Sequence, residues 1–255
     1  MASENTTIQL TIENHIATIR LNNPERHNAL ASSDMEQFRE ALAAIKKNAD
    51  VRVLILTGAG NKTFCAGAAL DQLSAGDMEA YDFPTLTDAL AQLSIPKICA
   101  FNGSVYGGGV ELGLCCDFRI GIPGMRMFVP PARIGICYHL SGIKRYLSLL
   151  GAANTKRILV ASEEFNTEGL QLMGYLTHLC DVEALEATVR ELAERIAGYA
   201  PMAVQAMQRI IDQHESGELS EEEANHWVKS CWQSEDLQEG LKAMQEKRAP
   251  SFKGN

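Results

Sequence analysis

Two glycine-containing turns carry the residue types needed to hold a negative charge. The first is Phe64–Ala68, with the letters FCAGA, and the second is Asn102–Gly109, with the letters NGSVYGGG. Each is expected to leave a strand and enter a helix, where the first backbone amides lack partners and favour anions. Two such amides converging on one oxygen would form an oxyanion hole. The alternative is that both turns are only tight packing corners, because glycine turns are common.

A single acid follows the second turn. Glu111 lies among Val110, Leu112 and Leu114, in an otherwise apolar stretch with helical character. A buried carboxylate there is costly unless it is paired or used, and burial favours its protonated form. We therefore expect a raised pKa for Glu111 and a role as a proton carrier near neutral pH. The alternative is a structural glutamate that is hydrogen-bonded to nearby amides.

The elements around these turns are expected to alternate between strands and helices. Alternating apolar residues over 8–13 and 15–21, with a break at Asn14, predict two strands joined by a tight turn. The nearly continuous apolar run 51–58 predicts a strand that is covered on both faces. Further strands are expected at 97–101 and 117–121, and helices after Ser32 or Ser33, over 84–93 and after the second glycine turn. This order indicates an α/β fold.

From Ser141 onward the pattern is almost entirely helical. The spacing of apolar residues predicts helices at 147–150, 155–161, 168–173, 185–196, 202–214 and within 221–247. The composition shifts at 195–201, so we divide the chain into an α/β core, residues 1–195, and a C-terminal helical region, residues 196–255. Trp227 and Trp232 lie in that region and could pack on the same subunit or on a neighbour.

Composition places the chain among ordinary globular proteins. Its 255 residues are 46% hydrophobic and 22% charged, which is enough for one large core. The net charge of −9 argues against a nucleic-acid partner, although local cations can still hold an anionic ligand. No apolar run is long enough to span a membrane, and the polar residues 1–9 lack a signal-peptide pattern. We therefore expect a cytoplasmic protein without a membrane segment.

Several other kinds of site find no support in the sequence. The seven cysteines include no CxxC pair and the histidines show no ligand spacing, so we expect reduced cysteines and no metal. Gly107–Gly109 is not a GxGxxG fingerprint, and no GxxxxGKS/T motif is present, which argues against dinucleotide and P-loop sites. Ser104 is not part of a GxSxG motif, which disfavours serine hydrolysis.

In their order and spacing, the motifs resemble the crotonase (enoyl-CoA hydratase/isomerase) superfamily over residues 7–253. A partial local resemblance, around Tyr138 and in the C-terminal letters SEDLQEG, is to its methylmalonyl-CoA decarboxylase-like members. The segments that carry the superfamily resemblance are Asn23–Leu30 (NPERHNAL), Phe64–Ala68, Ile95–Lys97, Asn102–Gly103, Gly107–Leu112, Cys116–Asp117, Ser234–Asp236 and Glu246–Arg248.

The resemblance implies a crotonase-type spiral of β-β-α turns with a C-terminal helical trimerisation region, assembled as a homotrimer or hexamer. It implies an acyl-CoA thioester as substrate and no cofactor other than the CoA of that substrate. The amides of Ala68 and Gly108 match the family's oxyanion hole, where two preorganised donors stabilise a thioester enolate. Glu111 matches the glutamate that activates water or moves a proton in hydratases of the family.

Three further residues match positions at which the family binds CoA. Arg26 matches a residue near the CoA phosphates, and Ala66, in the first glycine turn, would face the adenine and pantetheine. Lys247 matches a basic residue that reaches CoA, often across a subunit boundary. An ordinary solvated lysine is the alternative for Lys247.

The sequence departs from the hydratase pattern at Ala132, where hydratases carry a second glutamate. Alanine cannot donate or accept a proton, so water addition through two carboxylates would lack one partner. Tyr138 stands where the decarboxylase-like members carry a tyrosine, but Ala68 replaces the histidine those members tend to have. Tyr138 can be catalytic or a packing residue with a bonded hydroxyl. His139 can be a proton carrier or a structural histidine.

These observations favour a lyase of fatty acid metabolism that hydrates a 2-enoyl-CoA, with Glu111 alone handling the water. A second interpretation is decarboxylation or double-bond isomerisation of an acyl-CoA, with Tyr138 orienting the substrate. A non-catalytic acyl-CoA-binding scaffold is an interpretation from another class. Glu111 speaks against the scaffold, because a binding protein does not need a carboxylate beside the thioester.

Overall fold

The chain begins with a β-hairpin, as the alternating pattern predicts. The computed structural model describes residues 6–76, 79 and 81–255. β1 (Ile8–Glu13) pairs antiparallel with β2 (Ile16–Leu21). Asn14 and His15 join them with φ angles of 49° and 68°, and two positive φ angles are what a type I′ turn requires. The hairpin is confirmed. The prediction that residues 1–9 are not a signal peptide concerns in part residues 1–5, which lie outside the described residues.

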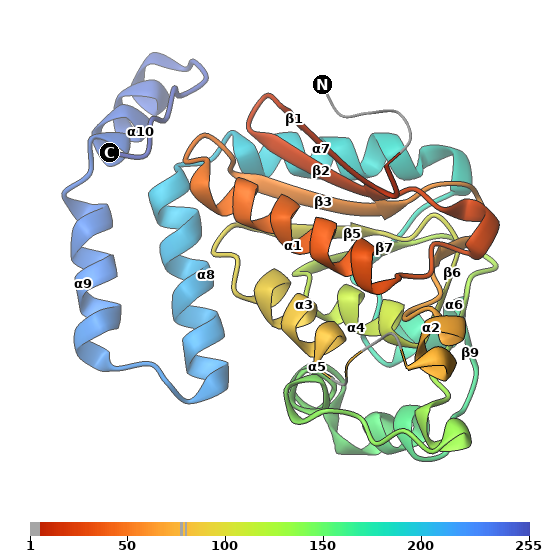
Figure 1. Ribbon diagram of the computed structural model, residues 1–255. Coiled ribbons are helices and arrows are strands. Elements are labelled where there is room, and N and C mark those ends of the chain that lie inside the picture. Colours follow the sequence, from red (N-terminus) through yellow and green to blue (C-terminus); the bar gives the residue numbers. More distant parts are fainter. Residues whose placement is uncertain (1–5, 77–78, 80) are drawn as a thin grey trace.

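The larger sheet follows the order β1-β2-β3-β5-β7-β10 in the described part of the chain (Figure 1). Beyond the hairpin every neighbouring pair is parallel. The strands that extend it are β3 (Val53–Gly58), β5 (Lys97–Ala100), β7 (Phe118–Gly121) and β10 (His178–Leu179). Parallel strands need crossover connections, and these carry the helices onto the two faces of the sheet.

Helices cover both faces of this sheet, which confirms the prediction for residues 51–58. α7 (Leu185–Ala197) lies on one side of the sheet and α1 (Ser32–Lys47) on the other (Figure 1). Apolar residues of α7 form one buried cluster with Val53 and Ile55, while Leu54 and Leu56 point into the larger cluster that includes α1. Alternate residues of β3 therefore belong to different cores, so the strand is apolar throughout.

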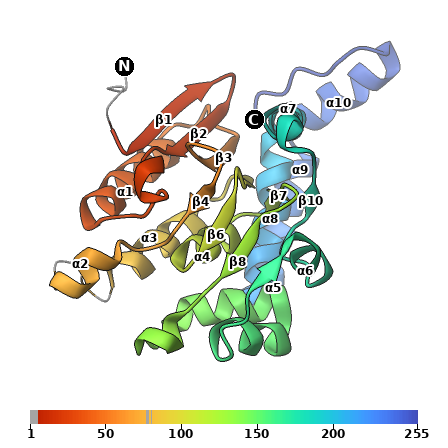
Figure 2. The same ribbon diagram turned by 90° about the vertical axis from the view of Figure 1, so that its right-hand side faces the viewer.

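A smaller sheet carries the glycine turns (Figure 2). β4, β6 and β8 are parallel neighbours, and β9 pairs antiparallel with β8. Because β4 and β6 run side by side in the same direction, the turns that follow them leave the sheet at the same edge. The strands are β4 (Thr63–Cys65), β6 (Ser104–Tyr106), β8 (Arg126–Phe128) and β9 (Phe165–Asn166).

The remaining elements of the body connect the strands of the two sheets. The longest, α5, is interrupted at Gly151, where φ is 71°. These elements are η1 (Pro24–Arg26), α2 (Leu70–Ala75), α3 (Asp82–Ala91), α4 (Gly108–Leu114), η2 (Pro131–Ile134), α5 (Leu140–Leu159), α6 (Thr167–Leu172) and η3 (Val182–Ala184). The α/β class expected from the sequence is confirmed.

Three helices form a C-terminal tail beside the body (Figure 1). They are α8 (Pro201–Ser216), α9 (Glu221–Trp232) and α10 (Glu235–Glu246). The preceding helix, α7, ends at Ala197 inside the sheet-covering core. The division into residues 1–195 and 196–255 stays a prediction. No helix in the described part of the chain is long and apolar enough to cross a membrane.

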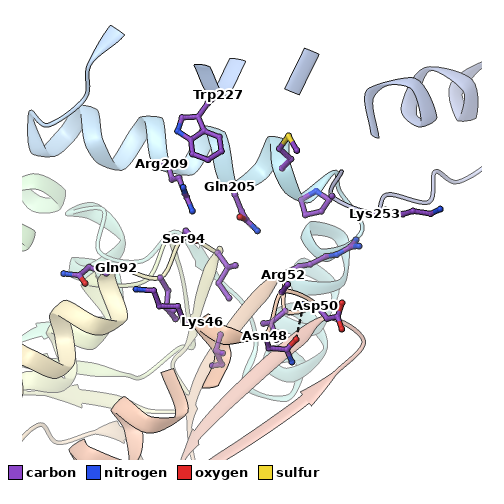
Figure 3. A pocket seen from close by; sticks show the side chains of 18 residues that line it. Lys46, Asn48, Asp50, Arg52, Gln92, Ser94, Gln205, Arg209, Trp227 and Lys253 are labelled. Atoms are coloured by element: carbon purple, nitrogen blue, oxygen red, sulfur yellow. Dashed lines mark hydrogen bonds between the residues drawn. The ribbon is translucent and has the colours of Figure 1, made fainter. Parts of the chain in front are cut away.

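A cavity of about 520 Å³ lies between the body and α8 and α9 of the tail (Figure 3). Arg52 of the body donates hydrogen bonds to the carbonyl oxygens of Ala197 and Phe252, at 3.0 and 2.8 Å. On the tail side, the Arg209 guanidinium lies 4.7 Å from the centre of the Trp227 ring. The tail is thus tied to the body at the Arg52 end, while polar and aromatic side chains line the gap beside it.

Candidate active site

The two glycine turns contact each other. Gly67 lies in the turn after β4 with a φ of +82°, and Gly108 begins α4 after β6. A Cβ atom added to Gly67 would lie 2.5 Å from the backbone nitrogen of Gly108. A side chain at position 67 would therefore collide with the Gly108 amide, so glycine is required both by the backbone angle and by this close approach.

Two backbone amides in these turns are available to an acceptor. In the first turn, the amides on either side of Ala68 are used, since Gly67 donates to the Cys65 sulfur and Ala69 donates to the Leu30 carbonyl. Among the residues that the structure describes, the Ala68 and Gly108 amides donate to no acceptor. Gly108 is the first residue of α4, where an amide has no partner within its own helix. These two donors fit the requirement for an oxyanion hole.

Phe83 covers the second turn, which the sequence did not indicate. A Cβ atom at Gly108 would lie 2.3 Å from the Cζ atom of Phe83, so the ring rests directly on the glycine backbone. Phe83 belongs to α3. Residues 77, 78 and 80, in the segment before Phe83, lie outside the described residues. Phe83 marks one side of the space next to the Gly108 amide.

Glu111 is fully buried in α4 and both of its carboxylate oxygens are bound. His139 Nε2 lies 3.0 Å from Oε2, and Arg145 Nη1 lies 2.6 Å from Oε1. Arg145 continues to α3, where it pairs with the Asp88 carboxylate and donates to the Thr87 hydroxyl at 3.2 Å. Glu111 is thus paired rather than isolated, which removes much of the cost of burying a charge.

These partners reverse the expected direction of the Glu111 pKa shift. Burial raises the pKa of Glu111, but the hydrogen bond with His139, together with the Tyr138 hydroxyl and the Arg145 charge, outweighs it. The pKa of Glu111 therefore lies below its ordinary value, and the expectation of a raised pKa is wrong. The carboxylate is ionised at neutral pH, as a base has to be.

Tyr138 stands beside this carboxylate with its hydroxyl buried. The ring stacks on His139, with centres 5.2 Å apart, and meets Tyr146 edge-on at 5.5 Å. The hydroxyl makes no hydrogen bond of normal geometry with a described residue, yet it is close enough to Glu111 to affect the carboxylate's ionisation. Burial raises the pKa of Tyr138 well above its ordinary value, so the hydroxyl stays protonated. It can donate to a ligand.

Ala132 cannot supply a second carboxylate. It lies in the short helix η2, where it is exposed to solvent. Four of the residues that the sequence suggested for the reaction lie together in the structure: Ala68, Gly108, Glu111 and Tyr138. The sequence left His139 open between two roles and gave no role to Arg145.

The CoA-binding candidates divide into two groups. Arg26 and Ala66 lie near the first glycine turn, since the Ala66 amide donates to the carbonyl of His27, the neighbour of Arg26. Arg26 is about half exposed and pairs with Asp71 at 2.5 Å, and Asp71 lies at the start of α2. Lys247 follows α10, which lies apart from the glycine turns in both views (Figures 1 and 2). Within one chain, Lys247 therefore lies away from Arg26 and Ala66.

The cysteines are free thiols that differ in their burial. Cys65, Cys99, Cys115 and Cys116 are buried free thiols, whereas Cys137 is exposed. In the described residues, no group of three or more His, Cys, Asp or Glu side chains is placed to hold a metal ion.

Comparison with known proteins shows the family and the fold. The pattern of the enoyl-CoA hydratase/isomerase family matches residues 11–255. A crotonyl-CoA hydratase from Syntrophomonas wolfei is 32% identical over 99% of both chains. An (E)-benzylidenesuccinyl-CoA hydratase from Thauera aromatica is 30% identical, covering 97% of this chain and 99% of that protein. The solved enoyl-CoA hydratase from Bacillus anthracis matches with a TM-score of 0.88 and 29% identity, over 98% of this chain and 100% of that one.

Proposed function

Because the chain belongs to the enoyl-CoA hydratase/isomerase family, we propose that it adds water to the double bond of a 2-enoyl-CoA thioester. The observation that carries this proposal is the pair of available amides at Ala68 and Gly108 beside a buried carboxylate. Glu111 follows Gly108 by three residues, about 4.5 Å along the helix axis. One helix thus presents both an oxyanion donor and the acid–base group.

The proposed reaction uses these groups in two steps. Water attacks the β-carbon, the double-bond electrons move toward the thioester, and the enolate oxygen is held by the Ala68 and Gly108 amides. Glu111 takes the proton that the water loses and then gives it to the α-carbon, so one molecule of water has been added. Because Glu111 has no exposed surface, substrate binding has to displace a neighbouring side chain before the carboxylate meets water.

A mass-spectrometric screen of CoA thioesters tests this function. The protein should add the mass of one water to a 2-enoyl-CoA such as crotonyl-CoA and leave the saturated thioester unchanged. Binding without turnover of any thioester would favour the scaffold interpretation and contradict the proposal.

Decarboxylation or isomerisation is a second candidate, supported by the exposed Ala132 and the available Tyr138 hydroxyl. Either reaction forms an enolate at the same amides but needs no second carboxylate for water addition. Faster loss of carbon dioxide from a malonyl-type thioester than gain of water by crotonyl-CoA would favour this candidate. Migration of a 3-enoyl double bond without added water would favour isomerisation.

Binding of the CoA phosphates by Arg26 gives a prediction. Arg26→Gln should raise the Kd of crotonyl-CoA about tenfold, because a charge-assisted contact with phosphate is lost. It should leave the Kd of crotonyl-pantetheine unchanged, because that ligand lacks the nucleotide. Isothermal titration measures both, and added salt should weaken only the CoA complex. Equal loss for the two ligands would contradict the role, and Arg157→Gln, at an exposed ion pair on α5, is the control.

The tail is proposed to form a trimer or a hexamer of paired trimers. Large apolar side chains are exposed on it, including Ile211 (60%), Trp232 (72%) and Met244 (78%), and such faces usually need a partner. Light scattering should give three or six times the chain mass of 27.9 kDa. Trp232→Glu should dissociate the assembly, whereas Leu172→Glu, at an 89% exposed leucine on α6, should not. A wild-type monomer at micromolar concentration would contradict this proposal.

In such an assembly, the Lys247 of one chain could reach the CoA held by the next. We further propose that the protein acts in fatty acid metabolism in the cytoplasm and needs no cofactor beyond the CoA of its substrate. The family membership supports these points, and the acyl-CoA screen tests the substrate class.

A further inference from the structure

The Glu111 carboxylate is held at both of its oxygens by groups that lie far away in the sequence. His139, before α5, reaches Oε2, and Arg145, one and a half turns into α5, reaches Oε1. An ionised carboxylate offers about four lone-pair positions. Two contacts therefore fix its orientation and leave about one position on each oxygen for a proton in transit.

His139 has its protonation pattern set by the helix that it caps. Its Nδ1 accepts a hydrogen bond from the Gly142 amide at 3.1 Å, which satisfies one free amide at the start of α5. An amide nitrogen can only donate, so Nδ1 has to present its lone pair. The partners thus assign the proton to Nε2, which donates to Glu111. The helix cap and the contact with Glu111 use the two nitrogens of one ring.

Arg145 is itself held in place at its far end. Nη2 pairs with the Asp88 carboxylate on α3, while Nη1, the nitrogen that contacts Glu111, also donates to the Thr87 hydroxyl on α3, and the side chain is only 16% exposed. A planar guanidinium with several fixed donors can bridge two carboxylates in one orientation. Arg145 thus joins α3, α4 and α5 at the reaction site.

Among the described residues, the other ionisable groups around Glu111 add no further positive charge. Asp88 on α3 is negative and faces the far side of Arg145. Burial raises the pKa values of the Cys115 thiol on α4, the Tyr138 hydroxyl and the Tyr146 hydroxyl on α5, so these three are neutral. Arg145 is therefore the permanent cation in contact with the Glu111 carboxylate.

We propose that His139 and Arg145 are positioning residues that hold Glu111 as an oriented anion, so that one carboxylate can do the work of two. This inference rests on the proposed hydration, in which Glu111 has to meet both the water and the α-carbon. A carboxylate free to rotate would face these two points in turn only by chance. Held at both oxygens, it keeps its remaining lone pairs aimed at fixed places.

Two substitutions of His139 separate the positioning role from the helix cap. Asparagine is a good cap residue but is too short to reach Glu111, so His139→Asn should lose the contact with Glu111 and keep the cap of α5. It should lower kcat for crotonyl-CoA at least about tenfold with little change in KM. His139→Ala should have a lower melting temperature than His139→Asn, because alanine also removes the cap of α5. Normal kcat in a stable His139→Asn protein would overturn the role of His139.

Substitutions of Arg145 test the positive charge through the pH profile. Glu111 acts as a base only when ionised, so activity is present above its pKa and is lost as the pH falls through it. The Arg145 charge is one of the effects that oppose burial at Glu111, so in Arg145→Met the pKa of Glu111 should rise and this loss of activity should move to higher pH. The loss of kcat/KM should be about tenfold larger at the acidic end of the profile than at the alkaline end. Arg145→Lys should shift the profile less, and Arg157→Met, also on α5, should not shift it.

A titration that needs no turnover separates this inference from the proposed function. Infrared difference spectra of the carboxyl group, with Glu111→Gln as the assignment control, report the ionisation of Glu111 directly. The band should titrate at higher pH in Arg145→Met than in the wild type. If it does so while no 2-enoyl-CoA is hydrated, the function fails and the fixed anion stands. If hydration is observed but the titration is unchanged by Arg145→Met, the inference is overturned.

Discussion

Glu111→Gln should lower kcat for a 2-enoyl-CoA by at least about a hundredfold, the lower range for loss of a general acid–base group. Glutamine keeps the size of the side chain and can still accept the hydrogen bond from Arg145 at Oε1. It cannot take a proton from water at neutral pH. Steady-state hydration of crotonyl-CoA measures the loss, and isothermal titration should show that crotonyl-CoA still binds.

Two controls accompany Glu111→Gln: one measures the stability of the variant, and the other removes a carboxylate elsewhere in the chain. The glutamine amide would face the Nε2–H of His139, and two donors cannot bond each other, so the melting temperature has to be measured alongside turnover. Glu163→Gln, at an exposed ion pair with Arg157, removes a carboxylate elsewhere and should leave kcat unchanged. Near-normal turnover in Glu111→Gln would show that the chemistry belongs to another residue, and Tyr138 would be the first candidate.

Gly67→Ala should lower kcat by about a hundredfold to a thousandfold, the usual loss when one oxyanion donor is removed. The added Cβ would lie 2.5 Å from the Gly108 nitrogen, so either the turn shifts or the amide moves away from the thioester oxygen. The φ of +82° also costs alanine about 1 kcal/mol of stability. Turnover of crotonyl-CoA and the melting temperature measure the two effects separately.

Gly124→Ala is the matched control for backbone strain. Gly124 has a φ of +79°, but a Cβ atom there would meet nothing within 4 Å. Gly124→Ala should lose the stability that the positive φ costs alanine, without the additional loss from a clash, and should keep its turnover. Equal turnover in the two variants would contradict the assignment of Gly108 to an oxyanion hole.

Much of the fold was predictable because its signals are local. The hairpin follows from alternation broken at Asn14, and β3 from an apolar run that serves two cores. Gly67 and Gly107, both with positive φ, mark turns that only a few residue types allow. The smaller sheet was not predicted, because its strands have only two or three residues and show no period.

The environment of Glu111 could not be predicted, because its partners are distant in the sequence. His139 and Arg145 lie 28 and 34 residues beyond it and meet it only through the packing of α5 on α4. An apolar helix around a lone acid indicates burial, and burial alone gives the wrong sign for the pKa. The helix-capping role of His139 was also missed, although a polar residue before a helical run is a recognised N-terminal signal.

Hydration in oxygen-18-labelled water tests the central claim most directly. Wild-type protein mixed with crotonyl-CoA should give a 3-hydroxy thioester with one labelled oxygen, and in deuterium oxide one deuteron should appear at the α-carbon. Glu111→Gln should form neither product at a comparable rate while still binding the substrate. If wild-type protein binds 2-enoyl-CoA thioesters and incorporates no labelled oxygen into any of them, the proposed function is contradicted.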